Sequence, residues 1–349
     1  MRYKTTFKTT LTEIIMATVR EIAKIAGVSP ASVSRILNND PTYHATEQTI
    51  KRVWSVAKKL NYSLPANHNS RRKLIRFGCI SRMTVERTKD SYFSSITASI
   101  QDYCLQHSIE LELLQSQFDI ENPKTLNGFL SSNLNGVIVM GDVDESVIDK
   151  LLQSGISVVG VDSSSDKIDN IRYNRYQAGC TAMQYLISKG HKKIAYVGSS
   201  VYPRDISSIG RFDAYKNMLT TNGLPIKQDW IIDCKWQRDI CYNEVCKLLS
   251  SEDKPTALFV ASDHMAIAAM GAISDCKLRI PEDISIIGIT DIELSKYLNP
   301  PLTTIKIPQE EIGIIAASTL LARVNNDTTI VKQIYIPTTL IERKSVRSI

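Results

Sequence analysis

The sequence contains no continuous apolar run of about 18 residues, the length that a helix needs to cross a bilayer. Its seven cysteines include no Cys-x-x-Cys pair, which argues against a zinc site or a disulfide framework and favours a reducing compartment, the cytoplasm. The motifs HExxH, GxSxG and Walker A are also missing, as is a GxGxxG between a strand and a helix. These absences predict a chain that is not an enzyme and has no metal or other cofactor.

Acidic residues are scarce at the start of the chain. Residues 1–76 contain 14 Lys and Arg but only 4 Asp and Glu, whereas the rest contains 28 basic and 32 acidic residues. The net charge of +6 therefore comes from a small basic head on a mildly acidic body. Positive charge concentrated in this way favours a polyanionic partner such as nucleic acid.

The basic head contains two short helical patterns separated by a glycine. In the first, apolar residues recur at helical spacing: Val19, Ile22, Ala23 and Ala26. Thr18 and Glu21 form a capping box in front of it, and Gly27 stands where a helix ends in a left-handed residue. Ser29 caps the second helix, and Pro30 occupies its first position. Two short helices about a glycine turn predict a helix-turn-helix.

The second helix has the features of a DNA-recognition helix. Its short side chains let the backbone approach the groove, and the guanidinium of Arg35 can bond guanine O6 and N7 together. A third helix over 45–60 is expected to complete a three-helix core through Ile50, Val53, Ala57 and Leu60. The alternative is a helical hairpin with no role at nucleic acid. The residues expected to contact DNA are Thr18, Ser29, Pro30, Ala31, Ser32, Ser34, Arg35 and Asn38.

Residues 18–62 resemble the DNA-binding headpiece of the LacI/GalR family of bacterial repressors. The matching stretches are REIAKIAGVSPASVSRILN at 20–38 and LNY at 60–62. In that family the start methionine lies one or two residues before the Thr-Val pair, so Met16 is the expected start. Residues 1–15 would then be an upstream extension or a disordered tail. The expected domains are the head at 16–62, a linker at 63–74 and an effector-binding and dimerisation body at 75–349.

The linker SLPANHNSRRKL, at 63–74, is polar and has no apolar period. In the family, the equivalent segment folds into a hinge helix on DNA and often wedges a leucine into the minor groove. Here Leu64 and Leu74 stand at the two ends, and no central leucine is present. Arg71 and Arg72 complete the list of expected DNA contacts, either in the minor groove or at phosphate.

From residue 75 onward, short apolar runs alternate with amphipathic stretches, which predicts parallel sheets covered by helices. Strands are expected at 75–80, 136–140, 156–161, 193–198, 257–261 and 283–290. Helices are expected at 94–107, 145–153, 176–189 and 264–275. The elements form two sets, before and after about residue 174. The expected fold class is a small all-α head followed by a two-lobed α/β core of parallel sheets.

The body is similar to the family's effector-binding core, which resembles periplasmic sugar-binding proteins. Matching stretches include ISKGHKKIAYVG at 187–198, RFDAYKNML at 211–219, ALFVASDHMAIAAMGAI at 257–273 and IPEDISIIG at 280–288. With the head, the resemblance covers residues 17–346. It implies two lobes that close on a small molecule, and a homodimer.

Polar residues at strand ends are candidate effector ligands, because parallel sheets bind ligands at that edge. They are Asp162, Ser262, Asp263, Thr290 and Asp291. The resemblance adds Tyr92, Phe93, Arg211 and Trp236, the last where one family member places a tryptophan against its sugar. The alternatives are structural: helix capping or loop bracing for Asp263 and Asp291, a turn for Asp162, an interlobe salt bridge for Arg211 and core burial for Trp236.

Two positions depart from the family's pattern. Thr290 stands where many sugar-responsive members carry Asp, and Ile307 stands where one member carries Gln. His264, just after Asp263, could also touch the ligand. The sugar can therefore not be identified from the contact pattern.

These features predict a sequence-specific transcriptional repressor that binds double-stranded operator DNA as a homodimer. Residues 38–49 and 283–310 most resemble repressors of galactose and β-galactoside genes. That resemblance implies a small sugar, galactose or a galactoside, that changes operator affinity. The alternative is a family member with a non-sugar corepressor that promotes DNA binding.

Overall fold

The computed structural model describes residues 18–37, 43–60, 62, 74–81, 91–116, 122–141, 143–199, 206–327 and 330–349. The chain divides into two units, residues 1–73 and 74–349. The tail at 1–15, nearly all of the predicted linker and the predicted DNA contacts Asn38, Arg71 and Arg72 lie outside the described residues.

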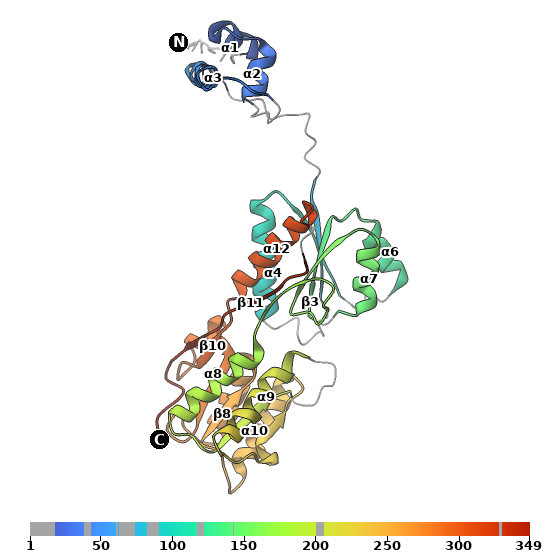
Figure 1. Ribbon diagram of the computed structural model, residues 1–349. Coiled ribbons are helices and arrows are strands. Elements are labelled where there is room, and N and C mark those ends of the chain that lie inside the picture. The colour runs from blue at the N-terminus through green and yellow to red at the C-terminus, as the bar shows by residue number, and fades with distance from the viewer. Residues whose placement is uncertain are drawn as a thin grey trace, which may run out of the picture. The chain divides into compact units, whose positions relative to one another are not determined.

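Over its described residues, the first unit forms the helices α1 (Val19–Ala26), α2 (Pro30–Leu37) and α3 (Glu47–Lys59) (Figure 1). The predicted capping box is present, since the Thr18 side chain accepts the Glu21 N–H and the Glu21 carboxylate accepts the Thr18 N–H at 2.7 Å. Gly27 ends α1 with φ 66°, in the left-handed region. Local sequence signals thus position α2 immediately after a tight turn.

Small and branched apolar side chains form the core of this unit. Its buried members are Ile22, Ala23, Ala26, Val33, Ile36, Leu37, Val53 and Ala57. The expectation that Ile50 belongs to this core was wrong, because its side chain is 37% exposed. Val53 and Ala57, one turn apart, are the buried residues of α3, and the predicted core residue Leu60 packs against the same cluster while partly buried.

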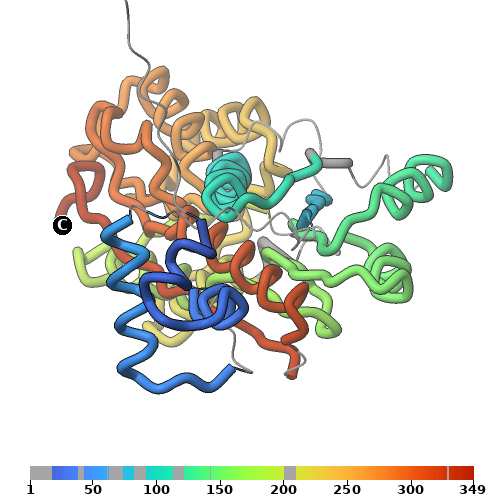
Figure 2. The backbone as a smooth tube through the Cα atoms, turned by 90° about the horizontal axis from the view of Figure 1, so that it is seen from above, coloured from blue at the N-terminus to red at the C-terminus, as the bar shows by residue number. Residues whose placement is uncertain are grey.

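The second unit has two lobes. The first lobe is built on a six-stranded sheet of order β11-β5-β4-β3-β1-β2, in which all neighbouring strands are parallel. Its strands are β1 (Arg76–Ser81), β2 (Glu110–Ser116), β3 (Gly136–Met140), β4 (Ser157–Val161), β5 (Asp169–Tyr173) and β11 (Gln333–Ile336). Helices α4 (Ser91–Gln106) and α12 (Gln309–Val324) lie side by side on one face, while α6 (Pro123–Ser131) and α7 (Glu145–Gln153) cover the other (Figures 1 and 2).

The second lobe has the sheet order β12-β10-β9-β8-β6-β7. Its strands are β6 (Ile194–Gly198), β7 (Ile231–Asp233), β8 (Ala257–Val260), β9 (Ser285–Thr290), β10 (Thr303–Lys306) and β12 (Thr339–Ile341), and only the β10–β12 pair in this order is antiparallel. Helices α8 (Arg175–Ser188) and α9 (Ile206–Thr221) cover one face. Helices α10 (Arg238–Ser250) and α11 (Asp263–Asp275) cover the other. The predicted fold class is confirmed.

The two lobes are not formed by two consecutive halves of the chain. The chain leaves the first lobe after β5, near the expected residue 174, but returns to it through α12 and β11. It then enters the second lobe again with β12. The expectation of two sets divided at residue 174 missed this return.

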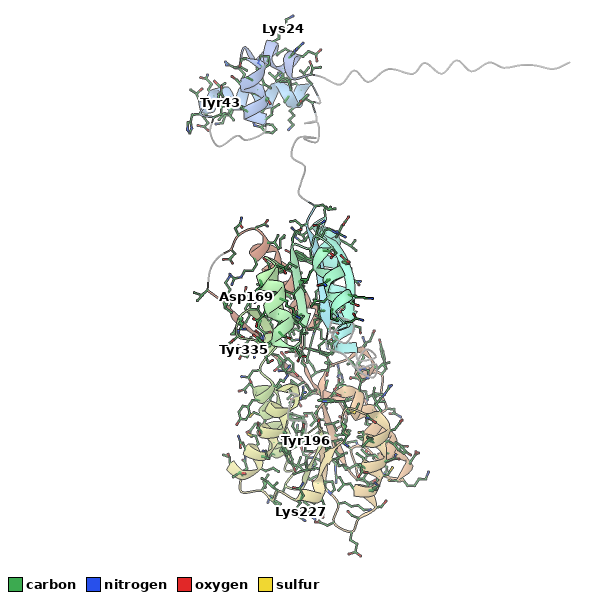
Figure 3. All side chains as sticks on the ribbon, turned by 90° about the vertical axis from the view of Figure 1, so that its right-hand side faces the viewer. Lys24, Tyr43, Asp169, Tyr196, Lys227 and Tyr335 are labelled. Atoms are coloured by element: carbon green, nitrogen blue, oxygen red, sulfur yellow. The ribbon has the colours of Figure 1, made fainter. Side chains whose placement is uncertain are left out.

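A buried ion pair anchors the returning segment. Arg323 of α12 donates from Nε and Nη2 to the two carboxylate oxygens of Asp169, each at 2.7 Å, and the Asp169 side chain is fully buried. Asp169 begins β5 in the first lobe (Figure 3) and also accepts the Lys332 N–H just before β11. One carboxylate therefore connects α12, β5 and β11.

None of the helices in the described ranges combines the length and hydrophobicity required to cross a membrane.

Candidate nucleic-acid interface and ligand cavity

The outer surface of α2 is polar and accessible. Pro30, Ala31 and Arg35 are exposed, and Ser32 and Ser34 are half-buried. Val33, Ile36 and Leu37 face inward, as the helical period predicts. The helix therefore presents short side chains and one guanidinium to the outside, the combination expected of a helix that enters a DNA groove.

A short hydrogen-bond chain holds the start of α2. The Ser29 hydroxyl accepts the Ser32 N–H at 3.0 Å, which caps the helix as predicted. Tyr43 donates its hydroxyl to Ser32 at 2.8 Å, and its ring lies 5.6 Å from the Arg35 guanidinium carbon. Tyr43, which precedes α3 (Figure 3), thereby orients both a polar and a cationic group of α2. The sequence reasoning did not identify it.

Thr18 caps the N-terminus of α1. Its N–H and its hydroxyl both lie against the Glu21 carboxylate, at 2.7 and 3.1 Å. A phosphate contact from Thr18 would therefore be made beside an existing capping box.

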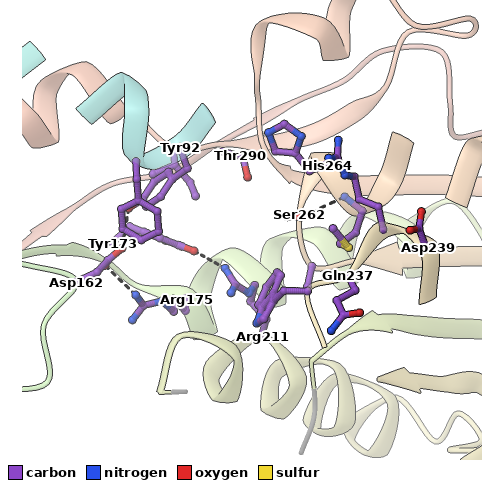
Figure 4. Close-up of a pocket in the computed structure, with 16 residues that line it drawn as sticks. Tyr92, Asp162, Tyr173, Arg175, Arg211, Gln237, Asp239, Ser262, His264 and Thr290 are labelled. Atoms are coloured by element: carbon purple, nitrogen blue, oxygen red, sulfur yellow. Dashed lines mark hydrogen bonds and ion pairs between the residues drawn. The ribbon is translucent and has the colours of Figure 1, made fainter. Parts of the chain in front are cut away.

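A cavity of about 430 Å³ lies between the two lobes of the second unit (Figure 4). The first lobe supplies residues from α4 and from the ends of β4 and β5. The second lobe supplies residues from α8, α9, the segment before α10, the starts of α10 and α11, and the end of β9. Seven of the nine predicted effector residues line the cavity: Tyr92, Phe93, Asp162, Arg211, Trp236, Ser262 and Thr290.

Asp162 is held from both lobes. Tyr92 donates its hydroxyl to Asp162 Oδ2 at 2.7 Å, and Arg175 Nη2 lies 3.0 Å from Oδ1. Burial, and then the nearby Asp162 carboxylate, raise the pKa of Tyr92 well above its ordinary value, so this phenol stays protonated and donates. Arg175 begins α8 in the second lobe, so its ion pair with Asp162 crosses the cavity wall between the lobes.

Arg211 makes a second connection between the lobes. Its Nη1 donates to the hydroxyl of Tyr173, the last residue of β5, at 2.5 Å. The Arg211 guanidinium also lies 5.3 Å from the centre of the Trp236 ring. Cation–π contacts of this kind fix the plane of an indole as well as the guanidinium. Arg211 and Trp236 therefore form one preorganised wall of the cavity.

Three of the lining residues have unusual backbone conformations. Asp162 has φ 55°, Trp236 has φ 59° and Thr290 has φ 137°. Positive φ costs free energy for residues with a Cβ, most of all for β-branched threonine, and such conformations concentrate at binding sites. Their gathering around one cavity supports it as the candidate ligand site.

The structure places Asp263 and Asp291 outside the cavity lining. Asp263 is fully buried and accepts hydrogen bonds from the hydroxyls of Ser295 and Thr304, each at 2.6 Å. Burial raises the pKa of Asp263 to about 6, and these hydrogen bonds oppose the rise. Asp291 pairs with Arg343 at 2.6 Å. Both carboxylates brace the chain at strand ends, which is the structural role considered for them as the alternative to ligand binding.

Several lining residues were missed or left in doubt by the sequence reasoning. Those absent from the candidates are Tyr173, Arg175, Gln237, Arg238, Asp239, Ala261 and Met265. His264 and Ile307, noted only in passing, also line the cavity. Tyr173 and Arg175 were missed because β5, DNIRY, is too polar to be recognised as a strand. Gln237, Arg238 and Asp239 directly follow Trp236. Their position next to this predicted effector residue was the sequence signal that could have identified them.

Within the described ranges, His, Cys, Asp and Glu side chains form no group of three or more that could bind a metal ion.

Two family descriptions match this chain. "Bacterial regulatory proteins, lacI family" matches residues 18–64, and "Periplasmic binding protein-like domain" matches residues 183–346. These ranges contain the three helices of the first unit and most of the second lobe together with α12 and β11.

Curated relatives align over almost the full length. The HTH-type transcriptional repressor PurR of Actinobacillus pleuropneumoniae serotype 3 (strain JL03) is 30% identical over 344 residues, which cover 96% of this chain and 99% of that protein. The PurR of Haemophilus influenzae (strain PittEE) is 32% identical over 344 residues, with 96% and 100% covered.

Solved structures show the same fold. A complex of the transcriptional regulator CelR with cellobiose has a TM-score of 0.69 at 21% identity, covering 94% of this chain and 99% of that chain. The lac repressor dimer bound to operator and the anti-inducer ONPF has a TM-score of 0.68 at 24% identity, covering 95% and 99%.

A helix-turn-helix head followed by a two-lobed periplasmic-binding-protein-like core defines a ligand-responsive DNA-binding regulator. This chain belongs to the LacI family of bacterial regulatory proteins. It is a DNA-binding transcriptional repressor and not an enzyme. The expected kinship with repressors of galactose and β-galactoside genes is not confirmed, because these curated relatives are named PurR.

Proposed function

We propose that this repressor binds its operator more tightly when a planar, nitrogen-containing heterocycle of the purine type occupies the cavity of its second unit. The ligand is a corepressor, which was the alternative considered from the sequence. The observation that carries the proposal is the engagement of Asp162 by both Tyr92 and Arg175.

Sugars present pairs of hydroxyl groups, for which carboxylates with vacant acceptor sites are well suited. Asp162, the buried carboxylate of the cavity lining, accepts the Tyr92 hydroxyl at Oδ2, and its charge is balanced by Arg175 beside Oδ1. At the end of β9, where many sugar-responsive family members carry Asp, this chain has Thr290. The remaining lining carboxylate, Asp239, is exposed at the start of α10.

The aromatic side chains favour a flat ligand. Tyr92, Phe93 and Tyr173 come from the first lobe and Trp236 from the second. Rings on both sides of a cavity can stack on the two faces of a heterocycle, with about 1–3 kcal/mol per stacked base. Gln237, Ser262 and Thr290 supply amide and hydroxyl groups for its polar edge. The names of the curated relatives point in the same direction.

On the DNA side, we propose that α2 enters the major groove and that Arg35 reads a guanine. Ser29, Pro30, Ala31, Ser32 and Ser34 set the close approach, and Thr18 contacts phosphate. Two copies of the chain pair, so that two heads bind the halves of a pseudo-palindromic operator. The protein then acts in the bacterial cytoplasm, where this DNA is.

The test is fluorescence anisotropy of DNA from the region upstream of the gene, with full-length protein at fixed salt. Hypoxanthine, guanine, adenine, galactose, lactose and allolactose are added one at a time. We expect a purine base to tighten DNA binding at least tenfold. A matched control is Lys227→Ala, at the far edge of the second lobe and outside the cavity lining, which should keep this response.

Release of DNA by a galactoside would overturn the corepressor proposal and support the earlier hypothesis of a sugar effector. Binding of DNA without a response to any of these compounds would remove the purine assignment only. Failure of Arg35→Ala to change base preference would contradict the assignment on α2.

A further inference from the structure

Tyr43 is fixed at both ends of its side chain. It belongs to the segment that precedes α3 (labelled in Figure 3), and its half-buried ring packs against the apolar cluster of the first unit. Its hydroxyl donates to the Ser32 hydroxyl of α2, 11 residues earlier in the chain, at 2.8 Å. Apolar packing therefore holds the ring, and a hydrogen bond holds its polar tip.

The hydrogen bond at the tip connects Tyr43 to the first turn of α2. The Ser32 hydroxyl that accepts it lies 2.9 Å from the Ser29 hydroxyl. Ser29 in turn caps α2 by accepting the Ser32 N–H at 3.0 Å. The Tyr43 ring thus keeps its place relative to α2 as long as this chain of hydrogen bonds is intact.

The ring of Tyr43 also acts on Arg35, one turn after Ser32 along α2. The guanidinium carbon lies 5.6 Å from the ring centre, within the range of about 6 Å over which a ring face attracts a cation. Arg35 is exposed, and an exposed arginine without such a contact samples many rotamers. The N–H donors lie in the guanidinium plane, so a contact with the ring leaves outward-facing donors available to another acceptor.

We propose that Tyr43 is a positioning residue for DNA recognition, whose ring holds the Arg35 guanidinium in the direction that reads one guanine. This inference rests on the proposed role of Arg35. Bidentate bonding to guanine O6 and N7 depends on the direction of the guanidinium fork. A fork that is already held in the free protein loses less conformational entropy on binding. It also adapts less readily to a wrong base, so Tyr43 increases discrimination between bases.

The alternative role for Tyr43 is a direct contact with the DNA backbone. A phenol can donate to a phosphate oxygen, which adds affinity without sequence information. The Tyr43 hydroxyl donates to Ser32 instead, and its ring lies beside a residue of the expected base-reading set. Both contacts favour the positioning role.

The test measures which base pairs the protein distinguishes. Fluorescence anisotropy follows full-length protein on its operator and on operators with one substituted base pair each, at fixed salt, without added ligand and again with hypoxanthine. Arg35→Ala first identifies the base pair whose preference it relaxes. We expect Tyr43→Leu to lower the preference at that same base pair about two- to fivefold, as for an exposed cation–π contact, and to leave other base pairs unchanged.

Further variants separate the ring from the hydroxyl and from the fold. Tyr43→Phe keeps the ring beside Arg35 and loses the bond to Ser32, so it should retain more of the preference than Tyr43→Leu. Tyr62→Leu is the matched control, because it removes another half-buried ring from the same apolar cluster, and it should leave base preference unchanged. Tyr43→Met, with an adaptable side chain, replaces Tyr43→Leu if that variant does not fold.

In the Arg35→Ala background, Tyr43→Leu should change no base preference, because the ring acts through the guanidinium. Uniform loss of affinity for all sequences, or an equal loss of preference in Tyr62→Leu, would overturn the inference. An unchanged preference in Tyr43→Leu, while Arg35→Ala relaxes one, would remove the role of Tyr43 and leave that of Arg35. If Arg35→Ala itself relaxes none, the assignment on α2 and this inference fall together.

Discussion

Asp162 and Arg175 form an ion pair of 3.0 Å that joins the two lobes inside the ligand cavity, and their side chains are 3% and 12% exposed. Asp162 directly follows strand β4 of the first lobe, and Arg175 is the first residue of α8 in the second lobe. The charge of the Asp162 carboxylate is therefore already balanced by Arg175 inside the cavity. The same ion pair connects the two lobes.

Asp162→Asn should destabilise the second unit by about 2–3 kcal/mol, because it leaves the Arg175 charge in a buried site without its carboxylate. Chemical unfolding at pH 7.5 measures the change. Asp149→Asn is the control, since its ion pair with Lys167 lies at the surface, and it should cost less than about 0.5 kcal/mol. Equal losses in the two variants would contradict a special role of the interlobe pair.

Arg35→Ala should weaken the best operator by about 1–3 kcal/mol and relax preference at one base pair in each half-site. Lys51→Ala, on the exposed surface of α3, should instead weaken all DNA sequences alike and reduce the salt dependence. Anisotropy with a set of single-base operator variants separates the two patterns. If Arg35→Ala lowered affinity uniformly, Arg35 would be a phosphate contact.

Trp236→Leu should weaken ligand binding tenfold or more, because it removes a ring that faces the cavity and stacks with Arg211. The change in intrinsic fluorescence on ligand addition should disappear with it. Trp54→Leu, in the first unit, should leave ligand affinity unchanged. An unaltered ligand titration in Trp236→Leu would show that the indole belongs to the wall and does not touch the ligand.

His191 should make the second unit less stable in mild acid. It is buried beside Thr256 and the Arg347 carbonyl, and burial lowers its pKa below the ordinary 6.5. The unfolded chain therefore binds this proton more readily, so a fall in pH through 6.5 favours unfolding.

The measurement is the thermal midpoint at pH 7.5 and 5.5 for the wild type and for His191→Gln. We expect the variant to be less stable at pH 7.5 but to lose less on acidification. The raised pKa of Asp263 makes the free energy of unfolding change with pH in the opposite direction. Because Asp263 is present in both proteins, its contribution cancels in the comparison. A loss of the same size in both proteins would exclude His191 as the cause.

The head could be predicted almost completely from the sequence because its signals are local. The capping box at Thr18, the left-handed Gly27 and the inward Val33 all depend on neighbours within a few residues. The central strands of the body were equally predictable, since strands buried on both faces appear as continuous apolar runs, such as GVIVM at 136–140.

The short strands β5 and β7 were not predictable in this way. β5 has the sequence DNIRY and β7 has only IID, so neither shows an apolar run or a clear alternation. Because β5 was missed, its last residue, Tyr173, and the following Arg175 were missed with it. The expectation that ligand-binding residues follow the strand ends correctly placed Asp162 and Ser262 in the cavity lining. It also included Asp263, whose side chain faces the interior of the lobe.

The sequence by itself determined the helix-turn-helix head, the α/β character of the body and seven of the sixteen residues that line the cavity. Only the tertiary structure decided that α12 and β11 return to the first lobe, where Arg323 meets Asp169 from 154 residues away in the chain. It also decided that Asp162 is engaged by Arg175. Such pairings join segments that are distant in the chain, so local propensity and periodicity do not predict them.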